Sequence, residues 1–165
     1  MTITLNIDTK TIETLDLSAV ENKIAELLPD AIADSDSKAK LIQQEQQLQF
    51  AISYHQEADD PRELSEIPEI RLWFVRLDAA YPWLPFFLDW KSGELARYTA
   101  MLVPHQFSRS EGIIYNPEAL EIYVMHKIFV LANWYQQQEI SSISRLKSFA
   151  QLFGYDIDDN FFETL

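Results

Sequence analysis

The 165-residue chain contains no cysteine, so it can form no disulfide and no zinc or iron–sulfur site on its own thiolates. It has only three glycines and no G-x-G-x-x-G or Walker A pattern, which argues against a phosphate-binding loop. The three histidines, His55, His105 and His126, are too far apart in the chain to form a local pair of metal ligands. The sequence therefore predicts no metal and no other cofactor.

Long hydrophobic runs are also missing. The most apolar segments are interrupted by charge, as at His126-Lys127, and none approaches the roughly 20 residues that cross a bilayer. The first ten residues, MTITLNIDTK, do not have the basic region and apolar run of an export signal. We expect a protein that is neither embedded in a membrane nor exported.

Basic residues are scarce, with 13 Lys and Arg against 26 Asp and Glu, and the net charge is −13. This balance argues against nucleic acid as a partner, because phosphate backbones are bound through positive charge. Residues 1–70 carry a net charge of −10 and residues 136–165 carry −3, whereas residues 71–135 are neutral. The acidic surface has two interpretations: it keeps the protein soluble, or it guides a basic partner.

The neutral middle is rich in large aromatic residues and arginine. Residues 71–116 hold three of the four tryptophans, together with four arginines. Tryptophan, tyrosine and arginine dominate binding energy at protein interfaces, so this stretch is the best candidate for a partner-binding surface. The predicted contact residues are Trp83, Trp90, Arg97, Tyr98, His105 and Arg109. The competing interpretation is a packed core, which we expect for at least one of Trp73 and Trp90.

Hydrophobic periodicity predicts the elements of the first hundred residues. Alternation indicates strands over residues 2–7 and 46–55, and apolar spacing indicates helices from Ser18 to Pro29 and over residues 69–80. Two apolar runs, residues 86–90 and 95–103, flank a short loop with Gly93 and favour a β-hairpin. A helix that begins near Ser92 is the alternative for the second run.

The pattern of residues 105–165 predicts a loop, a short strand and helices. Residues 105–112 are polar and predict a loop, and residues 112–115 predict a strand. Asn116-Pro117-Glu118 has the cap, first-turn proline and first-turn acid of a helix start. That helix, residues 117–136, is apolar around most of its circumference, so we expect it to be buried at the centre of the core. Ser141 or Ser142 should begin a last helix that ends before Gly154, and residues 158–165 could add a short turn.

Together these elements predict one domain over residues 1–165 with an α+β fold. Strands early, a hairpin in the middle and helices late favour a largely antiparallel sheet with helices packed on one face. No internal repeat and no linker divides the sequence.

Two segments, RLWFVRLDAAYPWLPFFLDWKSGELARYTAMLVPHQ and IIYNPEALEIYVMHKIFVLANW, resemble the chlororespiratory reduction 6 family. The resemblance runs from about Glu66 to the C-terminus, and residues 1–60 carry little of it. It implies a non-enzymatic assembly factor for the photosynthetic NDH-1 complex, a NADH dehydrogenase-like complex. The implied client is the small ferredoxin-like iron–sulfur subunit I of the soluble arm, with other soluble-arm subunits as further partners.

The resemblance also implies a place in the cell. Members act in the cyanobacterial cytoplasm or the chloroplast stroma, and a sequence without a transit-like leader points to the cytoplasm. The family supplies no catalytic residues to carry over. The sequence leaves the oligomeric state open: exposed aromatic residues would serve a homodimer as well as a client.

An enzyme is the alternative. His105 could act as a general base if Asp78 or Asp89 oriented its ring, which would suit a small hydrolase or lyase. The 11 residues between the two aspartates do not require them to meet, and no serine lies in a nucleophile-elbow context.

Overall fold

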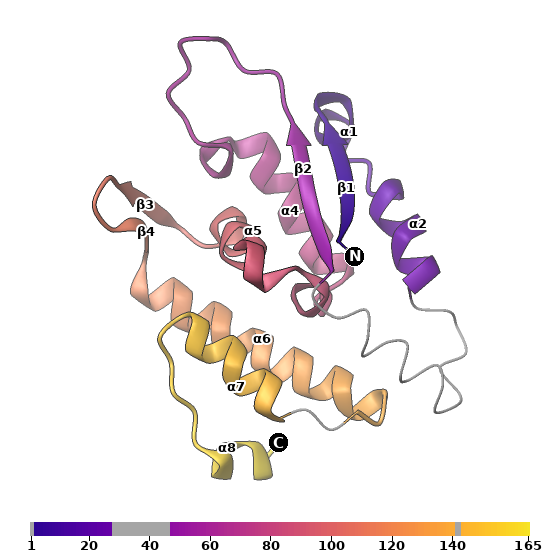
Figure 1. Cartoon of the computed structure of the whole chain (residues 1–165), viewed down its shortest axis with the longest axis vertical. Helices are drawn as coiled ribbons and strands as arrows, with labels where there is room; N and C mark the ends of the chain where they lie inside the picture. Colours follow the sequence, from indigo (N-terminus) through magenta and orange to yellow (C-terminus); the bar gives the residue numbers. More distant parts are fainter. Residues whose placement is uncertain (1, 28–46, 141–142) are drawn as a thin grey trace. The chain divides into compact units, whose positions relative to one another are not determined.

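The computed structural model describes residues 2–27, 47–140 and 143–165 (Figure 1). The chain divides into two compact units, Met1–Leu102 and Val103–Leu165. Compact substructures also occur inside one domain, so the single domain over residues 1–165 stays a prediction.

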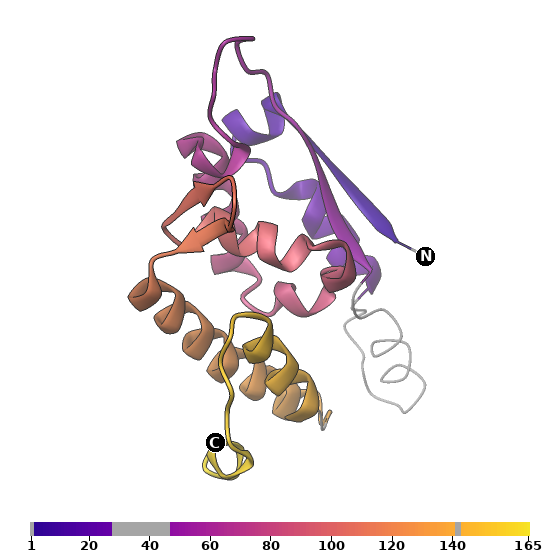
Figure 2. The ribbon, with the colours of Figure 1, turned by 60° about the vertical axis from the view of Figure 1, so that its left-hand side comes forward.

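The first unit contains a two-stranded parallel sheet. β1 (Ile3–Asp8) pairs with β2 (Leu48–Ser53), and Ile3 lies opposite Leu48. The strands confirm the two that alternation predicted. Their inward side chains, Leu5, Ile7, Leu48 and Phe50, are buried, whereas Thr4, Asn6 and Ala51 are exposed. Figure 2 shows the helices of this unit gathered on one side of the two strands.

Short local signals set the helices of this unit. α1 (Thr9–Glu13) begins directly after β1, where the Asp8 side chain accepts a hydrogen bond from the Thr11 amide at 2.8 Å. α2 (Ser18–Leu27) and α4 (Pro68–Ala80) confirm the predicted helices, and a 3₁₀ turn, η1 (Leu64–Glu66), precedes α4. The predicted end of α2 at Pro29 lies outside the described residues.

The hairpin predicted for residues 86–90 and 95–103 is wrong. The first run forms the 3₁₀ turn η2 (Leu84–Phe87), and a second turn, η3 (Trp90–Ser92), follows it. The second run is the helix α5 (Glu94–Leu102), which was the alternative. Pro85 favours the first turn, and Asp89 caps the second by accepting from the amides of residues 91 and 92.

An aromatic cluster fills the interior of the first unit. The Phe50 ring lies 6.1 Å from Trp73, 5.3 Å from Phe74 and 6.4 Å from Tyr98, measured between ring centroids. All four side chains are at most 2% exposed. Trp73 therefore confirms that at least one of the two tryptophans considered belongs to the core.

The second unit begins with an antiparallel hairpin. β3 (His105–Ser108) pairs with β4 (Gly112–Tyr115), and His105 lies opposite Tyr115. β4 confirms the predicted short strand. The loop predicted for residues 105–112 is wrong in its first half. Residues 105–108 form a strand because they pair with β4, although their polar composition does not indicate one.

α6 (Pro117–Gln137) confirms the predicted helix almost to the residue. The Asn116 side chain accepts from the Ala119 amide at 3.0 Å, as a helix cap should. The prediction that α6 is buried on several sides is wrong, because Ile122 is 72% exposed and Phe129 is 50% exposed. Apolar residues lie on both sides of this helix, and the side with Val124, Ile128 and Leu131 is the buried one.

Two further helices complete the second unit. α7 (Ile143–Leu152) confirms the predicted last long helix, and Gly154 follows it with φ of +86°. The predicted caps Ser141 and Ser142 lie outside the described residues. α8 (Asp159–Glu163) accounts for the predicted C-terminal turn.

The α+β class is confirmed, but the largely antiparallel sheet is wrong. In the described part of the chain there are two separate two-stranded sheets, and the larger is parallel. The strands of a parallel pair need a crossover connection, and the chain between β1 and β2 provides it. Among the described residues, no helix combines the length and hydropathy needed to cross a membrane.

Candidate partner-binding surface

The segment from Trp83 to Arg97 is held against the open edge of β2. Pro85 lies in η2, Asp89 caps η3, and Gly93 joins η3 to α5 with φ of +83°. A left-handed conformation of this kind favours glycine, and here it turns the chain into the first turn of α5. The prolines, the cap and the glycine thus fix the backbone that carries Trp90 and Arg97.

Backbone hydrogen bonds join this segment to the beginning of β2. The amide of Gln47 donates to the carbonyl of Phe87 at 3.0 Å, and the amide of Asp89 donates to the carbonyl of Leu48 at 2.8 Å. Leu48 and Leu88 form an isolated parallel bridge. The segment therefore begins like a third strand beside β2.

Two side chains continue the pairing where the segment turns into α5. Glu94 Oε1 accepts from the amide of Phe50 at 3.2 Å, and Arg97 Nη1 donates to the carbonyl of Phe50 at 3.1 Å. These bonds satisfy both polar backbone atoms of Phe50, which an open strand edge would leave unpaired.

Glu94 and Arg97 also interact with each other. Glu94 Oε2 lies 3.6 Å from Arg97 Nη1. Glu94 is only 6% exposed, and burial raises the pKa of its carboxyl, against the lowering effects of the Arg97 charge and the Phe50 amide. The Arg97 side chain is 39% exposed, so part of its guanidinium group faces solvent.

The two tryptophans of the segment are half-buried. Trp90 donates from Nε1 to the carbonyl of Pro85 at 2.9 Å, and its ring lies 5.8 Å from that of Phe86. Trp83 packs on Tyr81 and Phe87 at 5.8 and 5.5 Å. Each ring is fixed on one side and accessible on another, as an interface anchor must be.

The other predicted contact residues are in different environments. Tyr98 is 1% exposed and donates its hydroxyl to Asp78 at 2.8 Å, so it supports the surface from the core and does not form part of it. His105 and Arg109 belong to the second unit. His105 is half-buried in β3, whereas Arg109 is exposed in the turn between β3 and β4.

A crevice of about 330 Å³ lies at the base of the hairpin. His105 and Tyr115 line it, together with Pro104 and Pro117. His105 Nδ1 lies 2.9 Å from the carbonyl of Val103, which makes Nδ1 the protonated nitrogen in the neutral ring. Burial raises the pKa of Tyr115 to about 12.

The predicted pairing of His105 with an aspartate joins residues of different units. Asp78 and Asp89 both belong to the first unit, where Asp78 accepts from Tyr98 and Asp89 caps η3. The enzyme alternative therefore stays a prediction. In the part of the chain that the structure describes, no group of three histidines or acids is placed to hold a metal ion.

Sequence reasoning missed Glu94. It lies three residues before Arg97, which is a spacing that places two side chains on one side of a helix. The hairpin interpretation of residues 95–103 removed that signal, because residues three apart in a strand point to opposite faces.

Comparison with known proteins gives one family. The family model described as Chlororespiratory reduction 6 matches residues 7–164. The match begins at the end of β1 and contains the whole segment from Trp83 to Arg97, and so extends beyond the region that carries the resemblance in the sequence. No solved structure matches the chain significantly.

Proposed function

Since this chain belongs to the chlororespiratory reduction 6 family, we propose that it binds the immature small iron–sulfur subunit I of the photosynthetic NDH-1 complex. The family is one of assembly factors for that complex. In this role the protein catalyses no reaction. It holds the client while the client matures, and the assembly factor then leaves the finished complex. Other soluble-arm subunits are further candidate partners, and the cytoplasm is the proposed place of action.

The observation that carries the proposed site is the rigid presentation of Trp90 and Arg97. Both side chains are partly exposed, and both are tied by hydrogen bonds to backbone carbonyls of their own unit. Anchors that are ordered before binding lose little conformational entropy when the partner arrives. We therefore place the client on the surface formed by Trp83, Trp90 and Arg97 of the first unit. His105 and Arg109 are separate candidate contact residues on the second unit.

The composition supports a protein that holds its client, and not one that transfers an iron–sulfur cluster to it. Without cysteine, the chain cannot carry an iron–sulfur cluster on its own thiolates. Its net charge of −13 favours a client that exposes basic groups.

The test measures binding of recombinant, cluster-free subunit I to purified variants. Trp90→Ala and Arg109→Glu should each weaken binding by about tenfold or more, which is the loss of one interface anchor. Arg76→Glu, an exposed arginine on α4, is the matched control and should bind as the wild type does. Circular dichroism establishes that each variant is folded.

A second experiment tests the client itself. Tagged wild-type protein should enrich subunit I from native lysate, as identified by mass spectrometry. If the folded Trp90 and Arg109 variants enrich subunit I as well as the wild type does, the site is wrong and the client is right. If subunit I binds neither in lysate nor in purified form, the client assignment is wrong.

A further inference from the structure

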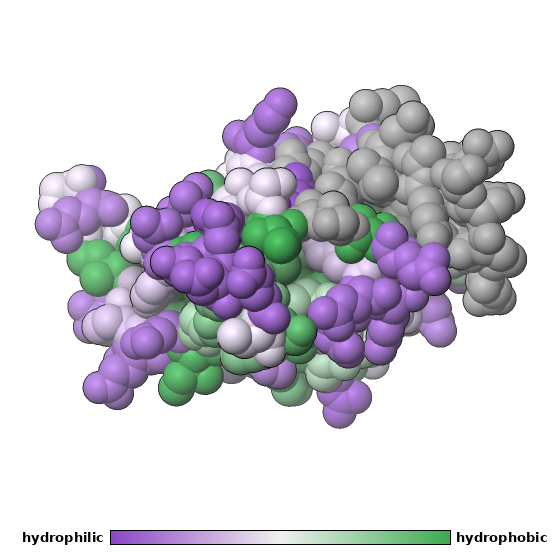
Figure 3. Space-filling model, turned by 90° about the horizontal axis from the view of Figure 1, so that it is seen from below, coloured by the Kyte–Doolittle hydropathy of each residue, from purple (hydrophilic) through white to green (hydrophobic). Residues whose placement is uncertain are grey.

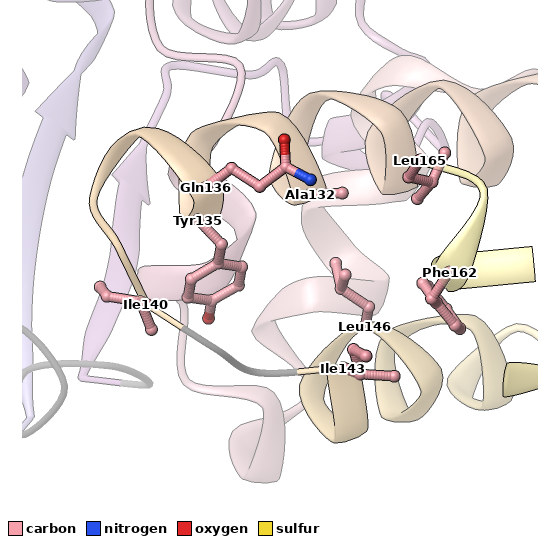
Figure 4. A pocket seen from close by; sticks show the side chains of 8 residues that line it. All are labelled: Ala132, Tyr135, Gln136, Ile140, Ile143, Leu146, Phe162 and Leu165. Carbon is pink, nitrogen blue, oxygen red and sulfur yellow. The ribbon is translucent and has the colours of Figure 1, made fainter.

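The second unit carries an apolar groove that the proposed function does not use. It has a volume of about 260 Å³ and lies between α6, α7 and α8 (Figure 4). The side chains that line the groove are hydrocarbon except for the amide of Gln136 and the hydroxyl of Tyr135, and the lining residue Ile143 is 44% exposed. This volume is below the roughly 300–1,000 Å³ of small-molecule pockets, so it suits one or two side chains of a partner.

The segments around the groove are acidic. Residues 136–165 contain five acids, at positions 139, 156, 158, 159 and 163, and two bases, Arg145 and Lys147. Lys147 already forms an ion pair with Asp159 at 2.8 Å, which ties α7 to α8. The hydrogen bond to Asp159 and the charges of Asp159, Asp156 and Asp158 raise the pKa of Lys147, so these three aspartates lie near α7. In Figure 3 hydrophobic patches are bordered by hydrophilic residues on the face that is seen from below.

We propose that this groove docks an amphipathic helical segment of a basic partner protein. A leucine or phenylalanine of that segment would enter between Ile143, Leu146 and Phe162, and flanking lysines or arginines would face the acids of residues 156–163. Apolar anchors at helical spacing in an apolar groove are an established mode of peptide recognition. The charge around the groove selects a basic helix over an acidic one.

A second copy of this chain is a poorer occupant. Acids outnumber bases by 26 to 13 over the whole chain, so a self-complex at an acidic groove would bring like charges together. The inference is independent of the surface around Trp90 and Arg97, because that surface belongs to the other unit.

The experiment uses the full chain and a designed peptide of about 16 residues with leucines at i, i+3, i+4 and i+7 and lysines elsewhere. Fluorescence anisotropy measures its dissociation constant. One control peptide has the same composition in an order without an apolar face, and the other has glutamate in place of lysine. We expect only the basic amphipathic peptide to bind.

Variants locate the binding. Ile143→Ser should weaken it by about tenfold, the loss of one buried aliphatic contact. Leu152→Ser is the matched control, since this leucine is on the same helix, is 56% exposed and does not line the groove. Glu163→Lys should weaken binding and reduce the loss of binding on addition of salt, because salt screens the attraction that this variant removes. Glu121→Lys on α6 and Trp90→Ala should leave binding unchanged.

Three results would overturn the proposal. The first is no binding of the basic peptide up to about 1 mM, the limit of weak affinity. The second is equal binding by the Ile143→Ser variant or by the glutamate peptide. The third is self-association of the wild type in sedimentation that Ile143→Ser abolishes, which would make the groove an interface between copies.

Discussion

Glu94 and Arg97 divide between them the two hydrogen-bonding atoms of a single backbone position: Glu94 accepts from the Phe50 amide at 3.2 Å, and Arg97 donates to the Phe50 carbonyl at 3.1 Å. One turn of α5 therefore closes an edge of β2 that neighbouring strands usually close. The same turn exposes part of the Arg97 guanidinium, so the closure of the sheet and the proposed partner surface depend on the same two side chains.

Replacement of Glu94 tests this closure. Glu94→Ala leaves the buried Phe50 amide without its acceptor and should lower the free energy of unfolding by about 1–3 kcal/mol. Glu94→Gln keeps an oxygen acceptor and should stay within about 1 kcal/mol of the wild type. Urea unfolding at pH 7 measures both, with Glu21→Gln, an exposed first-turn acid of α2, as the control. Equal stability of the alanine variant and the wild type would contradict the role of this bond.

The pH dependence of stability gives a second test of Glu94. Burial raises its pKa in the folded protein above the ordinary 4.5. Between 4.5 and the raised value the folded state therefore binds more protons than the unfolded state, so the contribution of Glu94 to stability falls as pH rises through this window. Glu94→Gln should remove this part of the slope in urea unfolding curves, and Glu21→Gln should keep it. A steeper slope in the glutamine variant would show that the sign is wrong.

Gly93 determines where α5 begins, and its replacement should cost stability through the backbone alone. Its φ is +83°, and a Cβ atom placed on it would meet no atom within 4 Å. Gly93→Ala should therefore destabilise the protein by about 1–2 kcal/mol, the cost of the left-handed conformation for a residue with a Cβ. Gly93→Asn should cost less, because asparagine tolerates this conformation better. Thermal unfolding checks the order, and equal losses for both variants would point to a steric cause.

Local signals were sufficient for some elements and insufficient for others. α6 was predicted closely because Asn116, Pro117 and Glu118 each favour a helix start without help from the rest of the fold. α5 was misassigned because the contacts that fix its first turn are distant: Glu94 lies 44 residues from Phe50, and Arg97 lies 47. Periodicity within a window contains no information about such contacts.

For the candidate surface, too, the sequence was sufficient for one part of the prediction and insufficient for another. Composition located the stretch with the tryptophans and arginines, but it could not tell an exposed ring from a buried one. Trp90 and Tyr98 both combine a large ring with one polar group, and both are hydrogen-bonded, yet only Trp90 is accessible. Tyr98 is buried because it lies on the face of α5 that meets the ring of Phe50, whereas Trp90 lies before that helix, in η3. Both placements depend on tertiary contacts. Likewise, the parallel pairing of β1 and β2 depends on the crossover and not on the alternation within either strand.

The aromatic cluster around Phe50 should be sensitive to shape. Phe50→Leu keeps an apolar side chain but removes the edge-to-face contacts with Trp73 and Phe74, so we expect a loss of about 1–3 kcal/mol in unfolding free energy. Phe129→Leu is the matched control, because that ring is 50% exposed and its replacement should change stability by less than about 0.5 kcal/mol. The near-ultraviolet circular dichroism should change in the first variant, and unchanged stability there would contradict the packing.

Tyr115 offers a spectroscopic test of the second unit. Burial raises its pKa from 10.0 to about 12 in the folded protein, because the apolar surroundings disfavour the phenolate. The folded state therefore keeps the proton through an interval in which the unfolded chain loses it, and stability should fall as pH rises from 10 to about 12. Burial also raises the pKa of Tyr54 and Tyr81, so absorbance at the tyrosinate band should show a late-ionising component that Tyr115→Phe reduces by one tyrosine and Tyr155→Phe leaves unchanged. If Tyr115→Phe leaves the amplitude of the late component unchanged, the Tyr115 hydroxyl does not have the apolar surroundings that the structure gives it.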